Sequence, residues 1–125
     1  MVESSKKRAV ILVVEDDALI RTEASFIISD GEFDVIEAAN ADEAIEVLEA
    51  RRDITVLFTD IQMPGSMDGL KLAAAVRDRW PPILIVATSG HVSIGEDDLP
   101  HGARFLPKPY SPTEILTTLR ELTAA

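Results

Sequence analysis

The sequence predicts an α/β fold in which the five strands of one parallel sheet alternate with helices. Short apolar runs rich in β-branched residues alternate with segments whose apolar residues recur at helical spacing. Three of these runs are apolar almost throughout, which is typical of strands covered on both faces. Such alternation gives a parallel sheet with right-handed crossovers and helices on both sides.

The strands are expected in the order 9–14, 33–38, 55–59, 82–88 and 103–107. The first, third and fourth are the continuous apolar runs, so we expect them to be buried on both faces. The second alternates Phe33 and Val35 with the polar Asp34, which indicates a less covered strand at an edge of the sheet.

Four helices have clear boundaries in the sequence. They are expected over 17–29, 41–52, 68–80 and 112–122, with Asp17, Asn40, Asp68 and Ser111 as N-caps, and Glu114 completes a capping box with Ser111. The segment 91–102 is different because Gly95, Pro100 and Gly102 interrupt it. We expect a short or irregular fourth helix there.

Length, composition and charge limit the class of protein. The 125 residues match one ordinary domain, so we expect a single domain over 1–125 with 1–7 as a flexible tail. The net charge of −10 makes direct nucleic acid binding unfavourable, because phosphates would be repelled. The absence of cysteine excludes disulfides and thiolate chemistry. No secretory or membrane-spanning segment is recognisable, so we expect a cytoplasmic protein that does not bind membranes.

Polar residues follow the strands at the points where the strands end. The acidic run 15–17 follows the first strand, Asp60 ends the third, Thr88 ends the fourth, and Lys108 follows the fifth. Because the carboxyl ends of parallel strands share one edge, we expect these side chains to converge there. Asp60 as an ordinary loop acid is the alternative, since strand ends often carry Asp.

Clustered carboxylates repel one another unless a cation lies among them. Oxygen ligands without His or Cys favour Mg²⁺, which takes a few carboxylates and keeps several waters. A carboxylate can also attack phosphorus and form an aspartyl phosphate, a reaction that depends on positioning and charge neutralisation. A metal ion, a lysine and a threonine hydroxyl would supply both.

The chain resembles the receiver domain of two-component response regulators. Four motifs carry the resemblance: ILVVEDD at 11–17, FTDIQMPGSMDG at 58–69, VATSG at 86–90 and FLPKPY at 105–110. The resemblance implies a flavodoxin-like (βα)5 three-layer sandwich with strand order 2-1-3-4-5. It also implies a role for each matching residue: Asp60 as phosphoacceptor, Glu15, Asp16, Asp60 and the Gln62 backbone carbonyl around Mg²⁺, Thr88 and Lys108 on the phosphoryl group, Thr88 and Phe105 as switch residues, and a cis Lys108–Pro109 peptide.

The sequence departs from the family pattern in four places. Pro107 precedes the lysine and removes a backbone donor, which an edge strand tolerates. Gly65 and Ser66 lengthen the loop after Asp60 by one residue, and Phe105 has no hydroxyl at the aromatic switch position. The interrupted fourth helix lies in the face that receivers usually present to partners.

The function expected is that of a phosphoacceptor which receives a phosphoryl group from a sensor histidine kinase or phosphotransfer protein and then changes a protein-interaction surface. It would assist its own phosphorylation and dephosphorylation, and it would not be an enzyme. The alternatives are a receiver module of a hybrid kinase and a non-catalytic interaction module. A stand-alone receiver is mildly favoured, the downstream partner is unknown, and a homodimer is compatible with the sequence.

Two further rivals fit the sequence less well. An aspartate-nucleophile phosphatase typically has a second acid two residues after the nucleophile, where this chain has Gln62. An FMN-binding protein would need a phosphate-binding loop after the first strand, where the acids 15–17 would repel the phosphate.

Overall fold

The computed structural model describes residues 8–65, 67–90 and 96–124. Its five parallel strands are ordered β2-β1-β3-β4-β5, as the resemblance implied. Along the chain the elements are β1 (Val10–Val14), α1 (Ala18–Asp30), β2 (Asp34–Ala38), α2 (Ala41–Ala50), β3 (Ile54–Asp60), α3 (Gly69–Arg79), β4 (Leu84–Ser89), the 3₁₀ helix η2 (Glu96–Asp98), β5 (Arg104–Pro107) and α4 (Pro112–Thr123).

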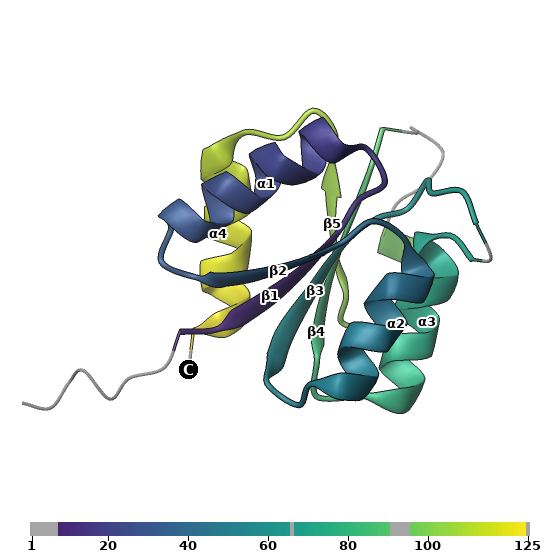
Figure 1. Ribbon diagram of the computed structural model, residues 1–125. Helices are drawn as coiled ribbons and strands as arrows, with labels where there is room; N and C mark the ends of the chain where they lie inside the picture. Colours follow the sequence, from purple (N-terminus) through teal and green to yellow (C-terminus); the bar gives the residue numbers. More distant parts are fainter. Residues whose placement is uncertain (1–7, 66, 91–95, 125) are drawn as a thin grey trace, which may run out of the picture.

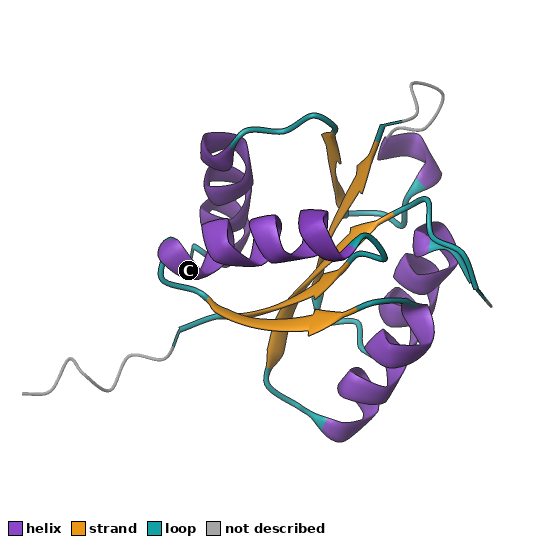
Figure 2. Cartoon of the chain, turned by 45° about the horizontal axis from the view of Figure 1, so that its top comes forward, coloured by secondary structure: helices purple, strands orange, loops and turns teal. Residues whose placement is uncertain are grey.

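The sheet forms the middle of three layers. Helices α1 and α4 cover one face, and α2 and α3 cover the other (Figure 1). Figure 2 shows the strands running between the two pairs of helices. Each face has its own apolar cluster, one built around Ile11, Ile28 and Ile115 and the other around Leu12, Leu57 and Leu72.

The burial of the strands agrees with their apolar patterns. Every residue of β1 is buried, and β3 and β4 are buried over nearly their whole length. Strand β2 is at an edge of the sheet and only its last residue, Ala38, is buried, which confirms the prediction from its alternating sequence.

The predicted caps begin all four α-helices. Asp17, Asn40, Asp68 and Ser111 each accept a hydrogen bond from a backbone N–H of the first turn, which satisfies a donor that the helix itself leaves unpaired. Ser111 and Glu114 form the expected capping box. The Asp17 cap matters most for the site, because it begins α1 directly after the acidic residues 15 and 16.

Several boundaries differ from the predictions by one or two residues. Strand β4 begins at Leu84 rather than at residue 82, because a turn closed by the Ile83 N–H and the Trp80 carbonyl (3.0 Å) occupies the residues before it. Within the described part of 91–102, the helical structure is the three-residue η2, so the short fourth helix is confirmed there. The expected tail, 1–7, lies outside the described residues. No helix in the described part of the chain has the length and apolar character needed to cross a membrane.

Candidate functional site

Two carboxylates are buried where neighbouring strands end. Strands β1 and β3 pair in parallel, with Val14 opposite Thr59, and finish at the same rim of the sheet. Glu15, the residue after β1, is 5% exposed, and Asp60, the last residue of β3, is 6% exposed. Asp16 beside them is exposed. Burying two carboxylates costs free energy unless a cation or hydrogen bonds compensate them.

Lys108 provides a cation within reach of both buried acids. Its Nζ lies 3.2 Å from Glu15 Oε1 and 3.3 Å from Asp60 Oδ1. The other carboxylate oxygen of Glu15 accepts a hydrogen bond from the Asp17 N–H at 3.0 Å. Asp60 Oδ1 is itself buried, and apart from its ion pair with Lys108 it has no partner in hydrogen-bond geometry among the described residues.

The environment shifts the protonation of all three groups. Burial raises the pKa of Glu15 and of Asp60 above the ordinary carboxyl range, and Lys108 offsets only part of that increase. Burial alone would lower the pKa of Lys108, but the carboxylates of Asp60 and Glu15 outweigh burial and raise it. The ammonium is therefore firmly held, whereas the two acids are incompletely compensated.

The acids can hold a small divalent cation. Glu15, Asp16 and Asp60 each offer one carboxylate oxygen, and these oxygens lie within 4.8 Å of one another. All the donors are oxygen, two of the residues are buried, and the third opens the group to solvent. This donor set fits Mg²⁺, which prefers oxygen ligands and keeps several waters.

The other residues singled out in the sequence adjoin this group. Thr88 is 1% exposed and pairs with Asp60 in the register of β3 and β4. The Lys108 N–H donates to the Ser89 carbonyl at 2.9 Å, and the Lys108–Pro109 peptide is cis, as implied by the resemblance. Gln62 lies two residues beyond Asp60, and its side-chain oxygen accepts a hydrogen bond from the Ser89 hydroxyl at 2.7 Å.

Phe105 lies on β5, two residues before the end of that strand. It pairs with Ala87 in the register of β4 and β5, is half-buried, and packs against the apolar cluster of the α2 and α3 face. His101, which had no partner pattern in the sequence, is exposed, and His91 lies outside the described residues.

Sequence reasoning missed three residues at this end of the sheet. The Arg21 guanidinium donates to the Glu15 carbonyl at 2.8 Å. Gly69 lies against the Asp60 backbone, and its N–H donates to the Ile61 carbonyl at 2.8 Å. The Tyr110 ring packs edge-on to Phe58, with 6.1 Å between the ring centroids. The one signal for Arg21 in the sequence is a basic residue one turn after an acidic N-cap.

Comparison with known proteins identifies the family. The model of the response regulator receiver domain matches residues 11–120. The hydrogenase transcriptional regulatory protein HoxA of Cupriavidus necator is 33% identical over 97% of this chain, and sensor kinase CckA of Brucella abortus is 33% identical over 91%. The chain spans only 25% of the length of HoxA and 12% of that of CckA.

A solved structure of a response regulator receiver protein has the same fold. The response regulator receiver protein of Sinorhizobium medicae superposes with a TM-score of 0.85 at 26% identity, covering 93% of this chain and 94% of its own. The sequence motifs, the strand order and these matches agree. The chain belongs to the receiver domain family of two-component response regulators.

Proposed function

We propose that this receiver accepts a phosphoryl group on Asp60. One observation carries the proposal: the buried Asp60 Oδ1 lacks a hydrogen-bond partner among the described residues and lies 3.3 Å from an ammonium group and beside two further acids. An oxygen in such a place is a nucleophile whose product, a new phosphoryl dianion, would meet positive charge.

The proposed donor is the phosphohistidine of a sensor kinase or phosphotransfer protein. An Asp60 oxygen attacks phosphorus, the bond from phosphorus to the donor imidazole nitrogen breaks, and that nitrogen keeps the electron pair and takes up a proton. Because the kinase makes phosphohistidine from ATP, we place the reaction in the cytoplasm. CckA, a sensor kinase, and HoxA, a regulator, are both much longer than this chain, so the proposal covers a stand-alone receiver and a module of a larger protein alike.

Each remaining site residue has a proposed part in this reaction. Asp16 and Asp60 would hold Mg²⁺ directly, Glu15 would hold it through water, and the Gln62 carbonyl would complete the protein's share of the ligands. The bound metal supplies positive charge next to the phosphoryl oxygens. The ammonium of Lys108 supplies a second positive charge that pairs with the phosphoryl group. Thr88 donates its hydroxyl, and its movement together with Phe105 changes the surface that a partner reads.

The site does not favour turnover of external phosphate esters. Phosphatases with an aspartate nucleophile typically carry a second acid two residues after it, and the side chain at that position here is the amide of Gln62, whose oxygen accepts a hydrogen bond from the Ser89 hydroxyl. We therefore propose a signalling phosphoacceptor that assists its own phosphorylation and dephosphorylation and is not an enzyme acting on other substrates.

The test uses a small acyl phosphate as donor, so that it does not depend on knowing the kinase. With Mg²⁺, the wild type should gain the mass of one phosphoryl group, and Asp60→Asn should gain none. Asp17→Asn is the matched control, because it makes the same chemical change two residues from Glu15, and Asn is also a good N-cap. Equal labelling of the wild type and Asp60→Asn would exclude Asp60 as acceptor. No labelling of either would favour an interaction module without phosphorylation.

A further inference from the structure

We propose that Arg21 is a positioning residue for the cation site, acting on Asp16 through the backbone. The inference rests on the proposed function, since it assumes that the acids bind Mg²⁺. Arg21 lies on α1, and its Nη1 donates to the Glu15 carbonyl oxygen at 2.8 Å. Its Nε lies 3.2 Å from Glu37 Oε1 on β2, so the guanidinium bridges the edge strand and the acidic turn.

The contact with the Glu15 carbonyl determines where the next side chain starts. The carbonyl of Glu15 and the N–H of Asp16 belong to one planar peptide unit, so holding the oxygen fixes the rotation of that whole unit. The direction in which the Asp16 side chain leaves the backbone follows from that rotation.

Asp16 needs this support more than the other two acids do. The Glu15 carboxylate is held by the Asp17 N–H and by Lys108, and Asp60 is the last residue of a buried strand. Asp16 is exposed, and among the described residues no hydrogen bond to its carboxylate is found. The restraint on Asp16 therefore comes through its backbone, where Arg21 acts.

The charge of Arg21 could work in the opposite direction, because a guanidinium repels a metal ion. However, Glu37 lies against the same guanidinium, so the pair as a whole is close to neutral. The Coulomb effect of this pair on a bound cation is correspondingly small. The main effect of Arg21 on the site is therefore the orientation of the Glu15–Asp16 peptide. Residues that orient metal ligands from outside typically contribute about 10- to 100-fold to metal affinity.

The test measures Mg²⁺ affinity directly by calorimetry, with the metal alone and no phosphodonor. Arg21→Met should weaken Mg²⁺ binding by about tenfold. The amide resonance of Asp16 should also move in the metal-free protein. Arg104→Met is the matched control: it removes the same charge from an exposed pair with Glu121 at the other end of the sheet, and should leave the affinity within about twofold.

The possible results separate this inference from the proposed function. If the wild type binds Mg²⁺ and Arg21→Met binds it equally well or more tightly, the inference is wrong and the metal site stands. If the wild type binds no Mg²⁺, the metal site is refuted and the inference falls with it. Should Arg21→Met not fold, Arg21→Lys decides: lysine keeps the charge but cannot hold both contacts, so its Mg²⁺ affinity should drop about threefold or more, and an unchanged affinity would overturn the inference.

Discussion

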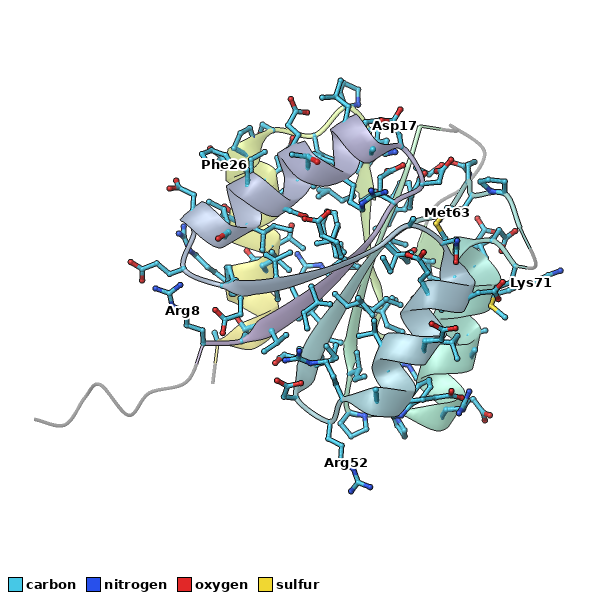
Figure 3. All side chains as sticks on the ribbon, viewed as in Figure 1. Arg8, Asp17, Phe26, Arg52, Met63 and Lys71 are labelled. Carbon is cyan, nitrogen blue, oxygen red and sulfur yellow. The ribbon has the colours of Figure 1, made fainter. Side chains whose placement is uncertain are left out.

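The two ends of the parallel sheet both carry many charged side chains, and they hold them differently. At the amino end Arg51 and Asp53 form a two-point contact at 2.7 and 2.9 Å, although both side chains are about half exposed. At the carboxyl end the contacts of Lys108 are longer, 3.2 and 3.3 Å, although its partners Glu15 and Asp60 are buried. In Figure 3, Arg8 and Arg52 project from the first end, whereas Asp17 and Met63 mark the second.

The difference shows that the exposed charges at the amino end pair with each other, whereas the buried acids at the carboxyl end are incompletely compensated. Exposed side chains can rotate until they meet in good geometry, and water lowers both the cost and the benefit of the contact. Buried side chains fixed by strand ends cannot relax in this way. One lysine shared by two buried acids leaves negative charge over, which costs stability and suits a site that binds a cation.

Substituting alanine for glycine at each end should give the largest contrast. A Cβ at Gly69 would overlap the Asp60 carbonyl oxygen and approach Ile61 Cα to 2.7 Å, and backbone cannot move aside. Gly69→Ala should therefore lower the free energy of unfolding by about 3 kcal/mol, at the upper end for overpacking, and weaken Mg²⁺ binding. A Cβ at Gly31 would overlap only Leu116 Cδ2, the end of a flexible side chain.

Gly31→Ala is therefore the control for that experiment. It should cost about 1 kcal/mol, because Leu116 can change rotamer, and should leave Mg²⁺ affinity unchanged. Urea unfolding and calorimetry measure both quantities. A Gly69→Ala variant with wild-type stability and Mg²⁺ affinity would mean that α3 does not press on the Asp60 backbone.

Removing the shared lysine should have the next largest effect. Lys108→Met leaves Glu15 and Asp60 buried without their cation, and should lower the free energy of unfolding by about 2 kcal/mol at neutral pH without metal, less than for a fully buried pair because Lys108 is partly exposed. Lys71→Met, which removes an exposed lysine on α3, controls for net charge. If the two variants were equally stable, Lys108 would contribute no more to stability than an exposed surface lysine does.

The contrast between the two ends could be predicted from the sequence only in part. Glu15, Asp60 and Lys108 follow apolar runs, so their convergence is a consequence of parallel strands ending at one edge. The caps Asp17 and Ser111 could also be predicted from the sequence, because capping depends on residues within one turn. These features are local or follow from topology.

The missed features depend on contacts between segments that sequence patterns do not relate. Nothing near Arg21 in the chain indicates that its guanidinium reaches the Glu15 carbonyl and Glu37 together, since β2 lies beside that helix only in the folded protein. The predicted helix over 68–80 includes Gly69, but the contact of Gly69 with the Asp60 backbone depends on where α3 starts relative to β3. Strand β4 was predicted two residues early because its apolar run continues into the preceding turn.

Lowering the pH should change the stability of the protein through Glu15 and Asp60 at the carboxyl end of the sheet. The pKa values of Glu15 and Asp60 are raised, so as the pH falls toward about 4, the ordinary carboxyl value, the folded state takes up protons before the unfolded state does. In that range these two acids contribute more stability as the pH falls. Asp60→Asn, which mimics the protonated acid, should be more stable than wild type at pH 7 without metal.

The measurement is the difference in unfolding free energy between Asp60→Asn and wild type, followed in urea from pH 7.5 down to about pH 4, the ordinary carboxyl pKa. The difference should shrink as the pH falls, because the wild-type carboxyl then takes up its proton. Saturating Mg²⁺ should reverse its sign at pH 7, since only the wild type has the third carboxylate. A difference that does not change with pH would show that Asp60 titrates as an ordinary exposed acid.

The smallest effect is expected at the amino end, from the pair of Arg104 on β5 and Glu121 on α4. Their 2.7 Å contact is shorter than either contact of Lys108, yet the side chains are 38% and 56% exposed. Because water already solvates both charges, a double-mutant cycle with Arg104→Gln and Glu121→Gln should give a coupling of about 0.2–1 kcal/mol that weakens with added salt. A coupling as large as the loss in Lys108→Met would mean that contact distance, rather than burial, determines what an ion pair contributes to this fold.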